Sequence, residues 1–143
     1  MSENLFQNVI STHARPDRLH EILVHPENLP LWDEELIQVV PTITAKFQLT
    51  RQPPALNEHE DLSVTATADQ IIYHSQGGRL AYDLVFSLAT EATHTILTEE
   101  LRVTSTGGLP LPLRLLAPIA QQAFAQKLHH LIALAESSRE VLS

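Results

Sequence analysis

Residues 70–89 read QIIYHSQGGRLAYDLVFSLA, and the pattern of this stretch decides the class of fold. Two adjacent glycines, Gly77-Gly78, separate two runs in which apolar side chains alternate, a pattern typical of a β-hairpin. Glycine readily adopts the positive φ that a two-residue hairpin turn requires. The sequence therefore predicts two antiparallel strands, 70–76 and 79–89, joined by a two-residue turn at Gly77-Gly78.

The second strand of this hairpin also predicts which face of the sheet is buried. Alternate positions of residues 79–89 carry large apolar side chains, whereas the positions between them carry mostly small or polar ones. Successive side chains of a strand point to opposite faces of its sheet. The expected inward set is Leu80, Tyr82, Leu84, Phe86 and Leu88.

Another long strand is predicted directly after the hairpin. Residues 90–93 indicate a turn, residues 94–105 alternate again, and Gly107-Gly108 ends the run. A carboxylate, Glu99, falls in the middle of a mostly apolar face. The expected inward set is Thr95, Leu97, Glu99, Leu101 and Val103.

Four further segments toward the amino terminus predict strands. Residues 5–13, LFQNVISTH, indicate a first strand packed on both faces, because valine and isoleucine are adjacent in its middle. Residues 37–40, 43–50 and 62–68 show a period of two. In the segment 43–50, the set expected on one face is Ile43, Ala45, Phe47 and Leu49.

Helical spacing appears in two places. Leu19, Ile22 and Leu23 predict a short helix that ends before Pro26, and the proline-bent segment 28–36 predicts a second short helix or a tight turn. Residues 113–137 predict one long amphipathic helix of ~37 Å. Its apolar stripe consists of Leu113, Leu116, Ala117, Ala120, Phe124, Leu128, Leu131 and Ala135.

The order of these elements predicts an α+β fold. One strand, two short helices, about six further antiparallel strands and a long C-terminal helix account for residues 1–143, which we expect to form a single domain. A long antiparallel sheet of about six to seven strands curves as it twists. Because one helix laid in the concave side cannot fill that volume, we expect a pocket between the sheet and the C-terminal helix.

The charge and the hydropathy of the chain disfavour several classes of partner and location. Nine basic residues against 17 acidic ones give a net charge of -8, which disfavours binding to nucleic acid. The amino terminus shows no secretory signal or membrane anchor, and the apolar stretch 108–125 is interrupted by three prolines, so we expect a cytoplasmic protein without an integral membrane segment.

No motif for a metal or a cofactor is found in the sequence. The chain has no cysteine, which removes disulfides and thiolate sites. His20 and His25 are five residues apart, and His129 and His130 are adjacent, so neither pair has the spacing of metal ligands on one helix face. Because phosphate-loop and dinucleotide motifs are also missing, we expect no metal and no cofactor.

Three segments carry a resemblance to a known family: HPENLPLW at 25–32, ATHTILT at 92–98, and the Gly-Gly-Leu-Pro approach at 107–110 to the long final helix. With these segments and the order of its elements, nearly the whole chain resembles the START-like (SRPBCC) superfamily in its polyketide cyclase/dehydrase branch. The resemblance implies a helix-grip fold with a cavity between the sheet and the long helix, used across the superfamily for lipids, hormones, polyketides and aromatic molecules. It does not imply an activity, because members include enzymes, carriers and regulators.

Glu99 is the candidate catalytic residue. Strict alternation places it on the inward face between Leu97 and Leu101, where burial would raise the pKa of its carboxyl and suit it to general acid or base catalysis. In the alternative, a one-residue bulge turns Glu99 outward and puts Glu100 in its place. The sequence favours this second, structural interpretation.

Other side chains are candidates for contact with a ligand, each with a structural alternative. Aromatic residues on a sheet face are often plain core, and Trp32 either caps the pocket mouth or holds the short helices against the sheet. Lys127 either extends to solvent, which we favour, or reaches a carboxylate, and the acidic run 58–61 is interpreted as a solvated loop. The ligand-binding candidates are Trp32, Phe47, Tyr73, Tyr82, Phe86, Glu99 and Phe124.

These observations support three functional hypotheses. The first is binding of a small hydrophobic or aromatic molecule, lipid-like or polyketide-like, in the cavity. The second is a cyclase, aromatase or dehydratase acting on a polyketide-like substrate, with Glu99 or a histidine moving protons. The third is a protein-interaction module without a ligand, and the sequence also allows a homodimer.

Overall fold

A computed structural model of the protein describes residues 3–43, 45–108, 110–137 and 141, and contains the predicted α+β arrangement. The helices are α1 (Pro16–Leu23), the 3-10 helix η1 (Pro26–Leu31) and α2 (Leu113–Glu136). The strands are β1 (Glu3–Thr12), β2 (Leu36–Ile43), β3 (Lys46–Arg51), β4 (His59–Ala66), β5 (Gln70–Gln76), β6 (Ala81–Glu91) and β7 (His94–Ser105).

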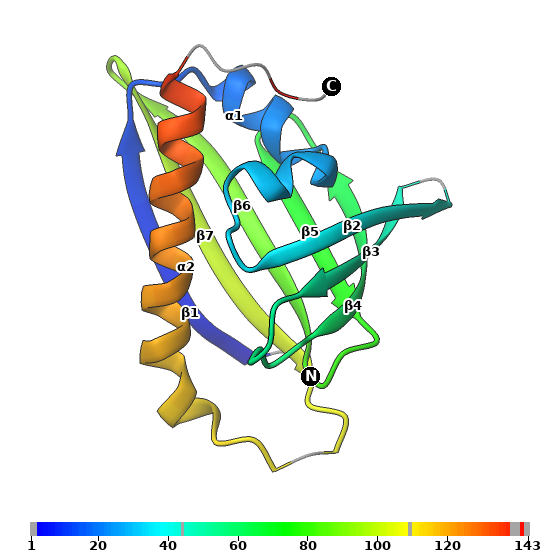
Figure 1. The fold of residues 1–143 in the computed structure, drawn as a ribbon. Coiled ribbons are helices and arrows are strands. Elements are labelled where there is room, and N and C mark those ends of the chain that lie inside the picture. The colour runs from blue at the N-terminus through cyan, green and yellow to red at the C-terminus, as the bar shows by residue number, and fades with distance from the viewer. Residues whose placement is uncertain (1–2, 44, 109, 138–140, 142–143) are drawn as a thin grey trace.

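All seven described strands form one antiparallel sheet in the order β1-β7-β6-β5-β4-β3-β2. Apart from β1, neighbouring strands follow one another along the chain, and β1 closes the other edge by pairing with β7. Figure 1 shows the curved sheet with α2 lying across its concave side next to β1, while α1 and η1 cover one end. None of the described helices is long and apolar enough to cross a membrane.

The predicted inward faces of β6 and β7 are confirmed. All five predicted side chains on each strand are buried, and residues opposite one another in the register include Phe86 with Glu99 and Leu84 with Leu101. The register irregularity between these strands lies at Ala81 and Tyr82, far from Glu99. The side chain of Glu99 is 0% exposed, so the favoured interpretation, in which a bulge turns it outward, is wrong.

Helix α2 packs tightly only in its C-terminal half. Leu128, Leu131 and Leu134 are buried there, whereas Leu115 and Ile119 in the first two turns are exposed. Burial of apolar surface is worth about 25 cal/mol per Å², so the C-terminal half supplies most of the hydrophobic attachment of the helix. The N-terminal half of α2 lies above the part of the concave face of the sheet that side chains do not fill.

The predicted two-residue turn at Gly77-Gly78 is wrong. β5 ends at Gln76 and β6 begins at Ala81, so four residues connect them, and of the two glycines only Gly77 has a positive φ, of 82°. The side chain of Asn57 donates to the carbonyl of Leu80 at 2.7 Å and accepts from its N–H at 2.9 Å. A Cβ on Gly78 would lie 2.5 Å from the Asn57 side chain, so Asn57 leaves room only for glycine at this position. The conformation of the turn therefore depends on Asn57, which lies far from it in the sequence.

Two strand predictions in the N-terminal half also need correction. β1 is an edge strand buried on one face, and Val9 in its middle is 61% exposed. The face predicted for 43–50 is divided, because Ile43 belongs to β2 and the chain reverses before Lys46 through Ala45, whose φ is 62°. Thr44 lies outside the described residues, and Phe47 and Leu49 are buried as expected.

Replacing Ala92 with glycine is expected to stabilise the protein by about 1 kcal/mol. Ala92 has a φ of 54° in the turn between β6 and β7, a left-handed conformation that is costly for residues with a Cβ. Urea unfolding would measure the gain. Ala89→Gly, at an exposed position of β6, is the control and should instead lose about 0.5–1 kcal/mol; equal effects of the two changes would contradict this interpretation of the turn.

Candidate ligand-binding site

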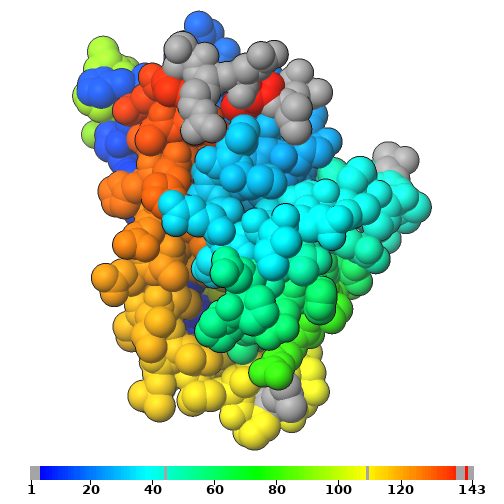
Figure 2. Space-filling view, in the orientation of Figure 1, coloured from blue at the N-terminus to red at the C-terminus, as the bar shows by residue number. Residues whose placement is uncertain are grey.

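A cavity of about 180 Å³, partly open to the surface, lies between the N-terminal half of α2 and the sheet. Figure 2 shows a hollow between α2 and the residues that follow β3, with atoms of β1 in dark blue at its bottom. Most of the walls are apolar, and charged groups are gathered on one side. The apolar walls include Leu5, Leu80, Leu101, Leu116, Ala120 and Phe124.

A smaller inner chamber of about 20 Å³ continues toward the short helices. Its walls include Trp32, Tyr73 and Glu99, and a space of this size holds about one water molecule or one oxygen atom. The two chambers share four residues, which form the partition between them. These are Arg51, Tyr82, Phe124 and Lys127.

Glu99 is the ionisable group of the inner chamber. Its Oε1 accepts a hydrogen bond of 3.2 Å from Nδ2 of Asn8, whereas its Oε2 has no hydrogen-bond partner among the described residues. Burial raises the pKa of the Glu99 carboxyl to about 8, against the opposing effects of Asn8 and the charge of Lys127. At neutral pH this carboxyl is therefore mostly protonated.

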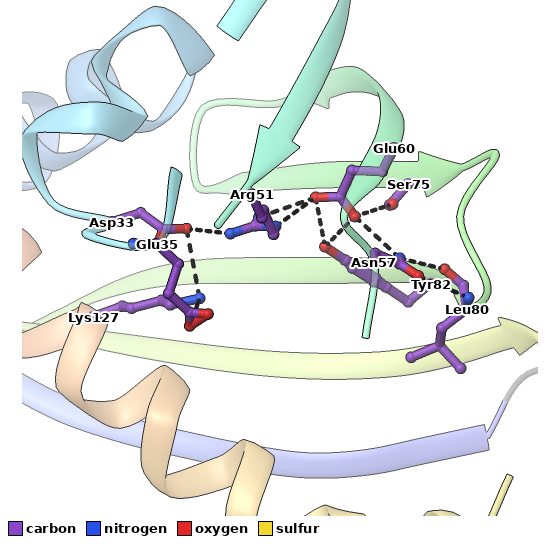
Figure 3. A network of polar contacts seen from close by, with 9 residues as sticks. All are labelled: Asp33, Glu35, Arg51, Asn57, Glu60, Ser75, Leu80, Tyr82 and Lys127. Carbon is purple, nitrogen blue, oxygen red and sulfur yellow. Dashed lines mark hydrogen bonds and ion pairs between the residues drawn. The ribbon is translucent and has the colours of Figure 1, made fainter. Parts of the chain in front are cut away.

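A network of charged and polar groups lies along one side of the cavity and extends from the sheet to Lys127 of α2 (Figure 3). Arg51 donates from Nη1 to Asp33 at 2.7 Å, and from Nε and Nη2 to Oε1 of Glu60 at 3.1 and 3.0 Å. Burial alone would raise the pKa of Asp33, but the charges of Arg51 and Lys127 lower it below its usual value. Arg51 therefore binds two buried carboxylates and helps to keep that of Asp33 charged.

Glu60 is fully engaged within this network. Its Oε2 accepts hydrogen bonds from Asn57 at 3.1 Å, from Ser75 at 2.7 Å and from Tyr82 at 3.0 Å, in addition to the bonds of Oε1 with Arg51. A carboxylate with this many donors has little capacity left to accept from a ligand. Glu60 is therefore a structural group that fixes Arg51 and Tyr82.

The prediction of a solvated loop at 58–61 is wrong at Glu60. Glu58 and Asp61 are exposed, but Glu60 lies in β4 and faces the interior two positions before Leu62. Alternation places Leu62 inward, and extending it by two residues toward the amino terminus would have predicted that Glu60 also faces the interior. Sequence reasoning also missed Asp33 and Arg51, because nothing in the local pattern shows that β3 and the end of η1 come together.

Lys127 reaches carboxylates, the less favoured of its two predicted alternatives. Its Nζ lies 3.5 Å from Oδ2 of Asp33 and 3.3 Å from Oε1 of Glu35, and 4.8 Å from the ring centroid of Phe124. The side chain is largely buried at the partition. A positive charge therefore stands between the outer and the inner chamber.

The structure separates the predicted ligand-binding residues into two groups. Tyr82 and Phe124 line both chambers, and Trp32, Tyr73 and Glu99 line the inner one. Phe47 and Phe86 are buried in the core and line neither chamber. The Phe86 ring packs edge-on against Trp32 and Tyr73, with centroid distances of 6.4 and 5.3 Å. Trp32 therefore lies at the bottom of the site rather than at its mouth.

A larger hollow of about 560 Å³ lies elsewhere on the surface. It is open, and charged side chains such as Arg15, Asp17 and Glu136 line it. An open, charged surface does not remove an apolar molecule from water, so the smaller, more enclosed and more apolar cavity beside α2 is the better candidate site. Among the described residues, no group of three or more acidic or histidine side chains has an arrangement that could hold a metal ion.

Comparison with solved structures identifies the fold. A START superfamily protein from Mycobacterium smegmatis superposes with a TM-score of 0.72, covering 92% of this chain and 99% of that protein, at 17% sequence identity. The chain has the START-like fold. The predicted resemblance to the START-like (SRPBCC) superfamily is thus confirmed at the level of the fold, including the long helix on the concave side of the sheet.

Two other solved structures also match the fold of this chain. The di-domain ARO/CYC StfQ of the steffimycin biosynthetic pathway matches with a TM-score of 0.75 and 13% identity over 95% of this chain and 51% of that protein. A conserved protein from Geobacillus kaustophilus matches with a TM-score of 0.71 and 14% identity over 98% of both chains. No protein-family model and no curated protein sequence matches this chain.

Proposed function

We propose that this START-like protein binds a small hydrophobic or aromatic molecule between α2 and the sheet. The observation that carries the proposal is the cavity of about 180 Å³ with mainly apolar walls. Apolar protein cavities of about 150 Å³ are known to bind benzene, so a single ring with a short substituent is of suitable size. A lipid-like or polyketide-like ligand would place its ring or the end of its chain here.

The geometry assigns different roles to the candidate residues. Phe124 and Tyr82 would contact the ligand from the helix side and from the sheet side, because both line the partition between the chambers. Trp32, Tyr73 and Glu99 would contact the part of the ligand that reaches furthest inside. Phe47 and Phe86 would act indirectly, by supporting the walls.

Apolar burial alone gives limited affinity. A ligand that buries about 300 Å² of apolar surface gains about 7.5 kcal/mol, from which the costs of association must be subtracted. Useful affinity therefore requires a few polar contacts in addition, and the charged and polar groups at the partition are the nearest candidates.

Filling the cavity is expected to abolish binding. Ala123 on α2 lines the outer chamber, so Ala123→Phe would place a ring in the space proposed for the ligand. Thermal shift measurements with ethylbenzene, naphthalene and decanoic acid should show stabilisation of the wild-type protein by at least one compound and none of the variant. A ligand at 100 times its Kd stabilises a protein by about 2.7 kcal/mol, which such a measurement resolves.

The matched control is Gln122→Phe, which adds the same ring at the neighbouring, exposed position of α2. This variant should respond to the compounds as the wild type does. If none of the three compounds stabilised the wild type, or if Ala123→Phe responded equally, binding in this cavity would be contradicted.

A second candidate function is that of a cyclase, aromatase or dehydratase, and the position of Glu99 favours it. Glu99 lines the inner chamber with one carboxyl oxygen free of partners among the described residues and with a raised pKa, conditions suited to proton transfer. The fold of StfQ, an ARO/CYC protein, is compatible with such a role.

Loss of water from a β-hydroxyketone would test this second function. The wild type should accelerate formation of the conjugated ketone, followed by ultraviolet absorbance, and Glu99→Gln should lower the rate by about 10²–10⁴-fold, the usual contribution of an acid or base. Equal rates for both proteins would exclude Glu99 as a catalytic residue. A protein-interaction role without a ligand is less supported, because the cavity is not filled by side chains.

The single domain, cytoplasmic location and homodimer stay predictions. Size-exclusion chromatography with light scattering would decide between the monomer and the homodimer.

A further inference from the structure

Two buried polar atoms at the inner chamber have no hydrogen-bond partner among the described residues. They are Nε1 of Trp32 and Oε2 of Glu99, whose side chains both line the chamber. Trp32 is 3% exposed and Glu99 is 0% exposed, so bulk solvent does not satisfy either atom. A buried polar atom without a hydrogen-bond partner typically lowers stability by about 1–3 kcal/mol. Two such atoms on side chains around one small space therefore indicate that a polar partner binds there.

The chemistry of these two atoms points to one kind of partner. An indole nitrogen can only donate a hydrogen bond, and a carboxyl in its neutral form donates through its O–H. Burial favours the neutral form of Glu99, whose other oxygen already accepts from Asn8. Two side chains that line the inner chamber therefore each have a donor without a partner among the described residues, and the chamber's volume of about 20 Å³ suits a single oxygen atom.

The other polar groups around the chamber are already paired. Arg51 binds Asp33 and Glu60, and Lys127 lies beside Asp33 and Glu35. Tyr73 donates its hydroxyl to the carbonyl of Leu23 at 2.5 Å, and Tyr82 donates to Glu60. These interactions leave Trp32 and Glu99 as the groups that distinguish one ligand from another.

We propose that the inner chamber receives the carbonyl oxygen of a ligand whose apolar body occupies the outer chamber. A carbonyl oxygen has two lone pairs and accepts from the Trp32 indole and the Glu99 carboxyl together. A hydrocarbon of the same shape leaves both donors unpaired, and sites with buried donors discriminate strongly against such analogues. The inference rests on the proposed ligand-binding function and specifies aromatic and other apolar ketones as its ligand class.

Acetophenone and ethylbenzene form a matched pair of probes, because they differ by a carbonyl in place of a methylene. In calorimetric titrations at pH 6.5, the wild type should bind acetophenone at least about tenfold more tightly than ethylbenzene. Trp32 is the only tryptophan, so its indole N–H gives a single, directly assigned signal in ¹H–¹⁵N spectra. Acetophenone should shift this signal downfield, and ethylbenzene should not.

Three variants separate the contribution of the donors from that of the apolar walls. Trp32→Phe and Glu99→Met each remove one donor. In both variants ethylbenzene should still bind, and the affinity for acetophenone divided by that for ethylbenzene should be about one or below. Glu99→Gln keeps an N–H donor of similar shape and should retain the preference for acetophenone. Asn8 keeps a hydrogen bond in all three, because its Nδ2 also donates to the carbonyl of Gln121 at 3.2 Å.

Ionisation of Glu99 removes its donor, so the preference should depend on pH. Raising the pH from 6.5 to 9 should weaken acetophenone binding by about tenfold, as expected for a group with a pKa of about 8, and leave ethylbenzene binding nearly unchanged. Lys127, Arg51, Asp33, Tyr73 and Tyr82 also face this chamber, and they are the same in Glu99→Gln. That variant should show no such pH dependence.

The outcomes separate this inference from the proposed function. If neither probe bound the wild type, the proposed function and the inference would both fail. If both probes bound equally well and the indole signal did not distinguish them, ligand binding would stand, and the chamber would be assigned to a resident water only. A preference for acetophenone that survived in both Trp32→Phe and Glu99→Met would overturn the assignment of the two donors.

Discussion

Replacing Glu60 with alanine is expected to lower the free energy of unfolding by about 3–5 kcal/mol, the usual cost of removing one partner of a buried ion pair. Glu60 accepts hydrogen bonds from four side chains, and one of its donors, Arg51, is charged and has a side chain only 12% exposed. Without Glu60, Arg51 keeps Asp33 as its single carboxylate partner. Urea unfolding followed by the fluorescence of the single tryptophan would measure the loss.

Glu58→Ala is the matched control for this prediction. Glu58 precedes Glu60 by two residues and is exposed, so its removal should change stability by no more than about 0.5 kcal/mol. A loss below about 1 kcal/mol in Glu60→Ala would show that the network does not hold the sheet side of the cavity together.

The second large effect concerns the dependence of stability on pH. The folded-state pKa of Glu99 is about 8, raised from 4.5, so between these values the folded protein keeps a proton that the unfolded chain releases. Stability from this group is fully present below pH 4.5 and is lost as the pH rises toward 8. A shift of this size corresponds to a loss on the order of 3–5 kcal/mol across the window.

Glu99→Gln removes this ionisation while keeping a side chain of similar shape. The free energy of unfolding of the wild type relative to Glu99→Gln should therefore fall between pH 4.5 and pH 8, and become constant above it. Because all other ionisable groups are the same in both proteins, their contributions cancel in the difference. A difference that did not change with pH would mean that Glu99 has an ordinary pKa in the folded protein.

Alternation within the long strands was enough to predict the buried side of the sheet. The alternate residues from Leu80 to Leu88 and from Thr95 to Val103 lie on the predicted face. The same period of two places Glu99 inward, but a bulge that turns it outward was the favoured interpretation, and only the structure excludes it. Side-chain direction in a regular strand depends only on position along the chain, which makes such predictions local. The START-like fold was similarly predictable from the order of the elements.

Predictions failed where residues far apart in the sequence decide the local structure. The turn after β5 depends on Asn57, which binds Leu80 from a different loop. The inward position of Glu60 is stabilised by Arg51 and Tyr82 from other strands. The pattern of apolar and polar residues along a segment predicts which positions are buried. It does not identify the distant residues whose hydrogen bonds and charges make burial of a carboxylate favourable.

The sequence by itself determined the strands and the long final helix, because each follows from periodicity within one segment, but it left the direction of Glu99 open between strict alternation and a bulge. Only the tertiary structure decided that Trp32 and Glu99 share one chamber, that Arg51 joins Asp33 to Glu60, and that α2 is tightly packed at one end only. These features depend on distances between elements, which the curvature of the sheet fixes and which no single segment encodes.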